Sequence, residues 1–203
     1  LVLPKILHWV PLETRLANPG GKGGISMLDL VVNSLRMRPD RILVGEIRRK
    51  QEAEVLFEAM HTGHSVYATL HANNARETIN RLTNPPIDLQ KQILSALSII
   101  LVQNINRRTG KRRTFQIAEI MPDGEARVLM QFNAFRESLD IVNEPVAIIE
   151  TLNLYTGLSK PQIYADMQSK ISILKWFVQK NINDVNRLGL ILSKYYRNKP
   201  FMH

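Results

Sequence analysis

The chain has 203 residues, which suits one large domain or one domain with a small appendage, and its 44% share of hydrophobic residues is too high for a disordered protein. It contains no cysteine, which excludes a disulfide framework and every metal site built on thiolates. Its 27 Lys and Arg against 18 Asp and Glu give a formal net charge of +9, and no apolar run approaches the roughly 20 residues that cross a bilayer. We therefore expect a globular protein with a basic surface and no transmembrane segment.

Residues 1–86 are predicted to alternate strands and helices. In chain order, the pattern predicts a strand over 6–16, a glycine-rich loop over 18–24, a helix from the Ser26–Asp29 capping box to about Met37, a strand over 42–44, a helix with Ala53, Leu56, Phe57 and Met60 on one face, a strand over 65–70 and a helix over 75–82. This alternation indicates a parallel, three-layer α/β domain.

The pattern changes after Asn84-Pro85-Pro86. A helix is predicted over 89–97, followed by an antiparallel meander with strands over 99–106, 114–121 and 126–132, and by helices from Ser159 onward. The first turn of the meander is densely basic, with Arg107, Arg108, Lys111, Arg112 and Arg113. Such a turn can attract nucleotide, nucleic acid or anionic lipid, or it can be a solvated hairpin tip.

Glu46 follows the apolar run Ile42-Leu43-Val44 and Gly45, at the carboxyl end of a predicted buried parallel strand. Open α/β sheets place their ligands at that end of their strands. A carboxylate there can polarise an attacking water or hold a water of a Mg²⁺ shell, as the acid of a Walker B strand does. The plainer alternative is a charge that favours the start of the next helix.

Two histidines flank the next predicted strand, in the block from Thr62 to Asn74. His64 precedes the strand and His71 follows it. An imidazole can donate a hydrogen bond to a phosphate oxygen. A metal site built from these residues and His61 lacks thiolates and a nearby acidic partner, so histidines with structural hydrogen bonds are the alternative that we weigh against phosphate sensing.

The segments Arg38–Arg48 and Thr62–Asn73 together resemble the type II/IV secretion ATPase superfamily, the motors of secretion systems, pili and archaeal flagella. Leu12–Arg15 and Asn84–Ile87 are similar to its archaeal branch. The resemblance implies a RecA-like ATPase core over residues 1–86, the rest of that core over 87–158 as mainly antiparallel strands, and a C-terminal helical subdomain over 159–203. It also implies a homo-hexamer that is cytoplasmic, lies at the inner face of the cell membrane and acts on a membrane platform protein.

The same resemblance implies roles for particular residues toward ATP and Mg²⁺. It makes Glu46 the Walker B acid, which reaches Mg²⁺ through water, and gives His71 and His64 the sensing of the terminal phosphate. Arg48 would pair with Glu46 or reach phosphate, and Arg15 would bind the γ-phosphate within the site or across a subunit boundary, because arginine offers a planar fork of donors. For both arginines a surface ion pair is the alternative.

The phosphate-binding loop of that superfamily is missing. No G-x-x-x-x-G-K-[ST] pattern occurs, and Gly20–Gly24 lacks the hydroxyl residue that follows the lysine. We expect the loop to lie upstream, in a parent protein of which this chain is a C-terminal fragment. The fragment alone should bind ATP poorly and hydrolyse little or none.

Two other kinds of function are weighed. A nucleic-acid motor or binding module on a RecA-like fold would use the positive charge, but the basic turn has no interleaved aromatic residues to stack bases, so no nucleic-acid partner is expected. A non-enzymatic assembly module would use the chain for subunit contacts alone.

Overall fold

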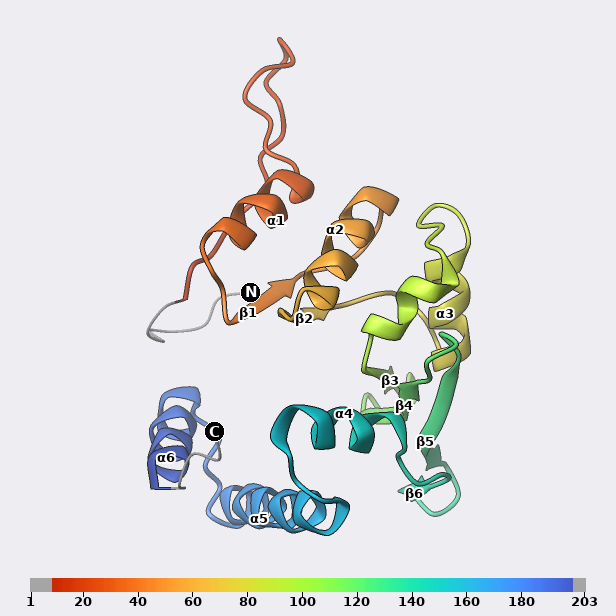
Figure 1. Cartoon of the computed structure of the whole chain (residues 1–203), viewed down its shortest axis with the longest axis vertical. Coiled ribbons are helices and arrows are strands. Elements are labelled where there is room, and N and C mark those ends of the chain that lie inside the picture. Colours follow the sequence, from red (N-terminus) through yellow and green to blue (C-terminus); the bar gives the residue numbers. More distant parts are fainter. Residues whose placement is uncertain (1–8, 199–203) are drawn as a thin grey trace. The chain divides into compact units, whose positions relative to one another are not determined.

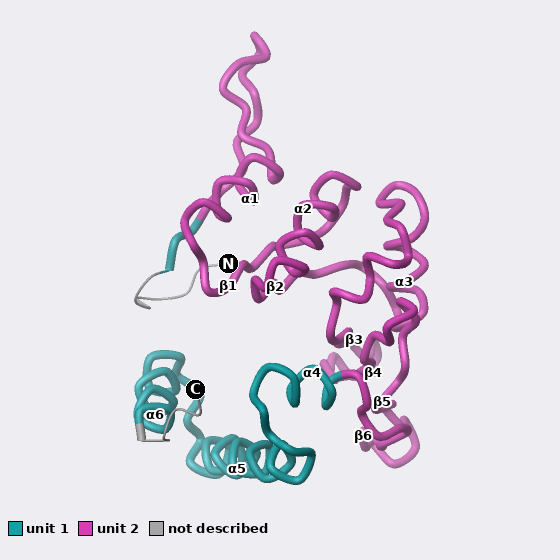
Figure 2. Tube along the Cα trace, in the orientation of Figure 1, with its two compact units in different colours: residues 1–11, 148–203 teal, residues 12–147 magenta. Residues whose placement is uncertain are grey.

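The computed structural model describes residues 9–198, which belong to two units (Figures 1 and 2). One unit is Leu12–Ala147. The other comprises Leu1–Pro11 and Ile148–His203, of which residues 9–11 and 148–198 are described. No helix in the described part of the chain is long and apolar enough to span a bilayer.

The first half of the larger unit alternates helices and strands, which confirms the α/β prediction. Its elements are α1 (Met27–Arg36), β1 (Arg41–Val44), α2 (Lys50–His61), β2 (Ser65–Ala68) and α3 (Ala75–Thr83). Strands β1 and β2 pair in parallel, with Ile42 opposite Val66 and Val44 opposite Ala68. Parallel neighbours need a crossover, and α2 supplies it.

Local sequence signals set the bounds of α1. The Ser26 hydroxyl accepts a hydrogen bond from the backbone N–H of Asp29, and the Asp29 carboxylate accepts one from Ser26 N at 2.9 Å. The two residues thus satisfy backbone groups that a helix start leaves without partners. At the other end Arg38, which precedes Pro39, adopts a positive φ of 52° and cannot continue the helix. The predicted helix is confirmed.

The hydrophobic core of this half lies on one face of the two-stranded sheet. Ile42 and Val44 point into it and are buried together with Leu56 and Phe57 of α2. The opposite face carries Leu43, which is exposed. Over the described residues the helices α1 and α2 and the sheet therefore form two layers, and the prediction of three layers is wrong there.

The second half of the larger unit is an antiparallel meander. After the 3₁₀-helix η1 (Lys91–Ala96) come β3 (Ile99–Ile105), β4 (Arg112–Ile120), β5 (Ala126–Asn133) and β6 (Ser138–Ile141), hydrogen-bonded in that order. The three predicted strands are confirmed, β6 is additional, and the segment expected to be a helix over 89–97 is a 3₁₀-helix over part of its length. Helix α3 packs on this sheet, where the buried Gln116 accepts a hydrogen bond from Ala75 N at 2.7 Å.

The helical part of the chain consists of α4 (Ala147–Thr156), α5 (Lys160–Gln179) and α6 (Val185–Asn198). The two helices predicted after Ser159 are confirmed, and α4 is additional. A capping box between Ser159 and Gln162 begins α5. The hydroxyls of Ser169 and Tyr195, 2.9 Å apart, join α5 to α6.

The predicted strand over 6–16 is wrong where it can be compared. Residues 6–8 lie outside the described residues, and residues 9–14 form no strand. Arg15 makes a single antiparallel bridge with Ile25, which closes a hairpin around the glycine-rich loop. Gly21 and Gly23 turn this hairpin with φ values of 74° and 77°, a conformation that favours glycine. The glycines therefore form the turn of this hairpin, and its two arms pair at the single bridge between Arg15 and Ile25.

Candidate functional site

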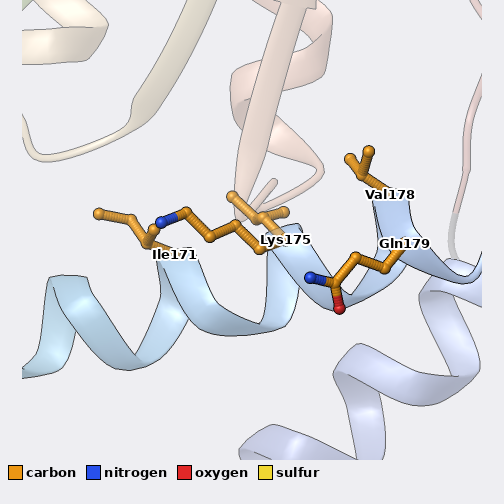
Figure 3. Close-up of a pocket in the computed structure, with 5 residues that line it drawn as sticks. Ile171, Lys175, Val178 and Gln179 are labelled. Atoms are coloured by element: carbon orange, nitrogen blue, oxygen red, sulfur yellow. The ribbon is translucent and has the colours of Figure 1, made fainter.

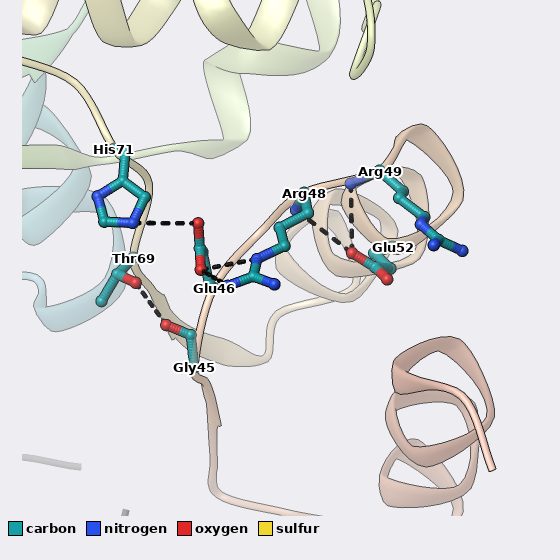
Figure 4. Close-up of polar contacts among 7 residues, drawn as sticks. All are labelled: Gly45, Glu46, Arg48, Arg49, Glu52, Thr69 and His71. Atoms are coloured by element: carbon teal, nitrogen blue, oxygen red, sulfur yellow. Dashed lines mark hydrogen bonds and ion pairs between the residues drawn. The ribbon is translucent and has the colours of Figure 1, made fainter. Parts of the chain in front are cut away.

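The candidate site lies where β1 and β2 end. Because the two strands are parallel, both carboxyl ends meet at the same edge of the sheet, with Glu46 just beyond β1 and His71 just beyond β2 (Figure 4). Two hydrogen bonds join the segments that follow Val44 and Ala68, the last paired residues of the two strands. Ile47 N donates to Thr69 O at 3.0 Å, and the Thr69 hydroxyl donates to the Gly45 carbonyl. These bonds hold the two strand ends side by side.

The Glu46 carboxylate lies between a guanidinium and an imidazole. Its Oε1 is 3.3 Å from His71 Nε2, and its Oε2 accepts hydrogen bonds from Arg48 Nε at 2.8 Å and Nη2 at 2.5 Å. The Glu46 side chain is 23% exposed, whereas those of Arg48 and His71 are 73% and 86% exposed. The acid is thus the least exposed of the three groups, and it lies between two side chains that are mostly in solvent (Figure 4).

The hydrogen bonds from Arg48 have an electrostatic consequence. They hold the pKa of Glu46 below its ordinary range, against a smaller opposing effect of desolvation, and the charges of Arg48 and His71 act in the same direction. The hydrogen bond to Glu46 also raises the pKa of Arg48. At neutral pH the pair is therefore a carboxylate and a guanidinium cation.

Acidic residues at two helix starts fix the loops that carry these groups. Glu52 Oε2 accepts hydrogen bonds from Arg48 N and Arg49 N, both at 3.3 Å, at the start of α2. Glu77 Oε2 accepts them from Asn73 N at 2.9 Å and from Asn73 Nδ2 at 2.8 Å, at the start of α3. Backbone and side-chain donation from Asn73, followed by that of Arg81, lowers the pKa of Glu77.

Our sequence reasoning missed these supporting residues. The spacing of Asn74 and Glu77, a helix-capping residue followed three positions later by an acid, was available as a signal for Glu77. No local pattern marks Thr69, whose hydroxyl reaches a carbonyl 24 residues away in sequence.

His64 and Arg15 are placed away from Glu46. His64 comes directly before β2, at the end of that strand opposite to His71. Its Nδ1 lies 3.2 Å from the Ala59 carbonyl and 3.3 Å from the Thr62 hydroxyl, so the ring closes the end of α2. Arg15 makes its contacts within its own hairpin, where Nε donates to the Gly23 carbonyl at 2.7 Å. Of the four residues predicted to act together with Glu46, only Arg48 and His71 therefore contact it.

The described residues do not enclose a metal ion. Among residues 9–198 no group of three or more His, Cys, Asp or Glu side chains has the geometry to hold one. Glu46 and His71 supply two groups that can ligate a metal ion, and Arg48 places a positive charge beside them. Two such groups are fewer than the six positions of an octahedral Mg²⁺ ion, so water or phosphate oxygens would have to fill the others.

A separate pocket lies along α5 (Figure 3). Its side chains are three aliphatic groups, one amine and one amide, from Ile171, Leu174, Val178, Lys175 and Gln179. It offers no carboxylate or imidazole, so the acid–base groups of the candidate site lie at the strand ends and not in this pocket.

Comparison with known proteins relates the chain to a family of secretion proteins. The sequence profile of the family "Type II/IV secretion system protein" matches residues 11–178. The uncharacterized protein MJ1287 of Methanocaldococcus jannaschii is 30% identical over 176 residues, which are 83% of this chain and 64% of that protein. The type IV pilus assembly ATPase PilB of Acinetobacter baylyi is 36% identical over 116 residues, which are 54% of this chain and 20% of that protein.

Among solved structures, the ATPase DotB of Legionella pneumophila matches at 27% identity with a TM-score of 0.40, over 48% of this chain and 28% of that one. The chain spans from 36% to 64% of the length of the two Methanocaldococcus jannaschii relatives that match most of it. The family profile covers more than half of the chain and includes every residue of the site. The chain belongs to the type II/IV secretion system protein family.

Proposed function

We propose that the chain is the C-terminal part of a hexameric motor that couples ATP hydrolysis to protein export or filament assembly at a membrane. The family supports this, as does the relative that is described as a pilus assembly ATPase. The observation that carries the proposal is the 3.3 Å contact between Glu46 Oε1 and His71 Nε2 at the carboxyl ends of two adjacent parallel strands. In a RecA-like core this edge faces the nucleotide.

Glu46 is the group that acts on water in this proposal. A carboxylate with a lowered pKa is ionised at neutral pH, so it can orient and polarise a water molecule for attack on the terminal phosphate. Glu46 would also hold Mg²⁺ through a water molecule, because Mg²⁺ in nucleotide sites keeps several of its waters. When bound, the ion supplies neutralisation of phosphate charge.

Arg48 and His71 are the phosphate-reading groups. Arg48 donates hydrogen bonds to the Glu46 carboxylate, His71 Nε2 lies 3.3 Å from it, and both side chains are far more exposed than Glu46. A phosphate oxygen that enters the site competes with Glu46 for these donors, and an arginine matches it with two parallel hydrogen bonds. Phosphate thereby releases the carboxylate of Glu46 to water.

Arg15 and His64, which do not contact Glu46, are also assigned roles toward phosphate. Arg15 lies on an exposed hairpin, a position suited to a phosphate in a neighbouring subunit. His64 would act through the end of α2 and strand β2, since its ring contacts Ala59 and Thr62. The phosphate loop itself has no counterpart in the 203 residues, so we assign turnover to the longer polypeptide and little or none to this chain alone.

The proposed motor acts at a membrane. We place it in the cytoplasm, at the inner face of the cell membrane, where it acts on a platform protein embedded in that membrane. Nucleic acid is not among its proposed partners.

Substitution of Glu46 in the longer polypeptide tests the proposal. Glu46→Gln keeps the size of the side chain and removes its charge, so ATP turnover should fall by at least about 100-fold, the lower end of what a positioned catalytic group contributes. Nucleotide affinity, measured by titration with a fluorescent ATP analogue, should stay within a few-fold. Glu58→Gln, on the exposed surface of α2, is the matched control and should leave turnover unchanged. Normal turnover of Glu46→Gln would remove Glu46 from its role.

A further inference from the structure

One end of the antiparallel sheet concentrates positive charge. In the order β3-β4-β5-β6, the β3–β4 turn and the β5–β6 turn lie at the same end of the sheet. Contacts between the two turns confirm this, because Arg113 Nη2 is 2.9 Å from Glu137 Oε2 and the Arg113 guanidinium lies 5.3 Å from the centre of the Phe132 ring. We call residues 104–113 and 132–140 together the sheet tip.

The charges of the sheet tip do not balance. Its six cations face two anions, Glu137 and Asp140, and both anions are already paired, with Arg113 and Arg136. The other four cations are exposed and form no ion pair within residues 9–198; they are Arg107, Arg108, Lys111 and Arg112. Among the described residues the tip therefore carries four cations without an anionic partner.

Hydrogen bonds give the β3–β4 turn a defined shape. The Asn106 side chain accepts hydrogen bonds from Arg108 N at 3.0 Å and Thr109 N at 3.1 Å, and Gly110 takes a φ of 68° that closes the turn. The cations consequently stand on a structured turn and are not carried by a flexible segment. A charge array held in this way loses less conformational freedom when it meets an anionic surface.

An aromatic ring accompanies these cations. Phe135, at the β5–β6 turn, is fully exposed. The Asn133 side chain accepts hydrogen bonds from Phe135 N at 3.0 Å and Arg136 N at 3.2 Å, which fixes the turn that presents the ring to solvent. The tip thus combines unpaired arginine and lysine with one apolar ring.

We propose that the sheet tip binds the surface of an anionic lipid bilayer. Arginine and lysine side chains near such a surface are attracted by the negative headgroups, and an aromatic side chain gains by entering the interface between headgroups and acyl chains. Single-stranded nucleic acid fits the tip less well, because it is bound by a series of stacking rings and Phe135 is the one fully exposed ring among the described residues of the tip. This surface contains none of the residues that we assign to nucleotide.

Vesicle flotation with the 203-residue chain tests the charges. The wild type should float with vesicles that contain one third phosphatidylglycerol and not with pure phosphatidylcholine. Arg108→Gln/Lys111→Gln should weaken binding to the anionic vesicles about 25-fold, since each cation near the surface contributes about fivefold. Arg187→Gln/Lys194→Gln on α6 makes the same change in net charge at exposed positions and should retain wild-type binding. Equal losses in the two double variants, or no binding by the wild type, would overturn the proposal.

A fluorescence experiment tests the ring. In the Phe135→Trp variant the added emission should shift to the blue on anionic vesicles and should be quenched by brominated lipids, whereas Tyr155→Trp, at an exposed position of α4, should show neither change. If the emission added by Phe135→Trp is neither shifted nor quenched, insertion of the ring is contradicted. Tight binding of a single-stranded oligonucleotide that depends on the tip, without vesicle binding, overturns the proposal in favour of nucleic acid. Because both assays omit nucleotide, their failure leaves the proposed ATPase function untouched.

Discussion

Gln116, in strand β4 of the antiparallel sheet, should stabilise the start of helix α3, which follows the site. Its side chain is buried and accepts the hydrogen bond of Ala75 N at 2.7 Å, at the first residue of α3, four positions after His71. Gln116→Leu keeps the volume but leaves the buried Ala75 N–H without an acceptor. Such a group costs about 1–3 kcal/mol. The lost donation from Gln116 to Gln131, at 2.9 Å, adds to that cost.

The expected magnitude follows from these two losses. A net destabilisation of about 2 kcal/mol should lower the melting temperature by about 4–8 °C, at the 2–4 °C per kcal/mol typical of proteins of 150–250 residues. Thermal unfolding followed by circular dichroism measures the shift, and hydrogen exchange should show faster exchange of the Ala75 amide in particular. Gln103→Leu is the control, because Gln103 is exposed and should change stability by less than about 0.5 kcal/mol. An unchanged melting temperature together with a protected Ala75 amide would refute the reasoning.

Two further outcomes concern the site and a turn. The pKa of Glu46 is lower in the folded protein than the ordinary glutamate value of about 4.3, so the ionised side chain stabilises the fold above that pH. This stabilisation is lost as the pH falls through the pKa that Glu46 has in the folded protein. In the Arg48→Ala variant, NMR titration should show that the pKa of Glu46 rises toward the ordinary value. Gly124→Ala should unfold at a lower temperature than Gly110→Ala, since both positions have positive φ but only at Gly124 would the added Cβ meet a backbone atom, 2.5 Å from the Lys91 carbonyl oxygen. Equal melting temperatures for the two alanine variants would contradict this reasoning.

Elements with local signals could be predicted from the sequence. Helix α1 carries its capping box at Ser26 and Asp29 and a stop at Pro39, all within a few residues of its ends. Elements that depend on distant partners could not be predicted. Strand β6 has four residues and exists through its pairing with β5, and α4 is apolar around most of its circumference, so its sequence shows no amphipathic stripe.

The same division applies to the site. The placement of Glu46 beside His71 follows from a general property of parallel strands, because their carboxyl ends lie at the same edge of the sheet. The support by Gln116 does not follow from any pattern, since 41 residues separate it from its partner Ala75. The roles assigned to all five predicted site residues stay predictions, and Arg15 and His64 make their hydrogen bonds within their own hairpin and helix end.

The two-stranded parallel sheet has a practical consequence for anyone who handles the chain. Within residues 9–198, β1 and β2 pair only with each other, so each strand has a lateral border of amide and carbonyl groups that no further strand occupies. Such borders readily recruit extended segments from other molecules. Concentrated samples of the isolated 203-residue polypeptide should therefore become turbid through intermolecular β-pairing. A lysine introduced at either border should slow this aggregation.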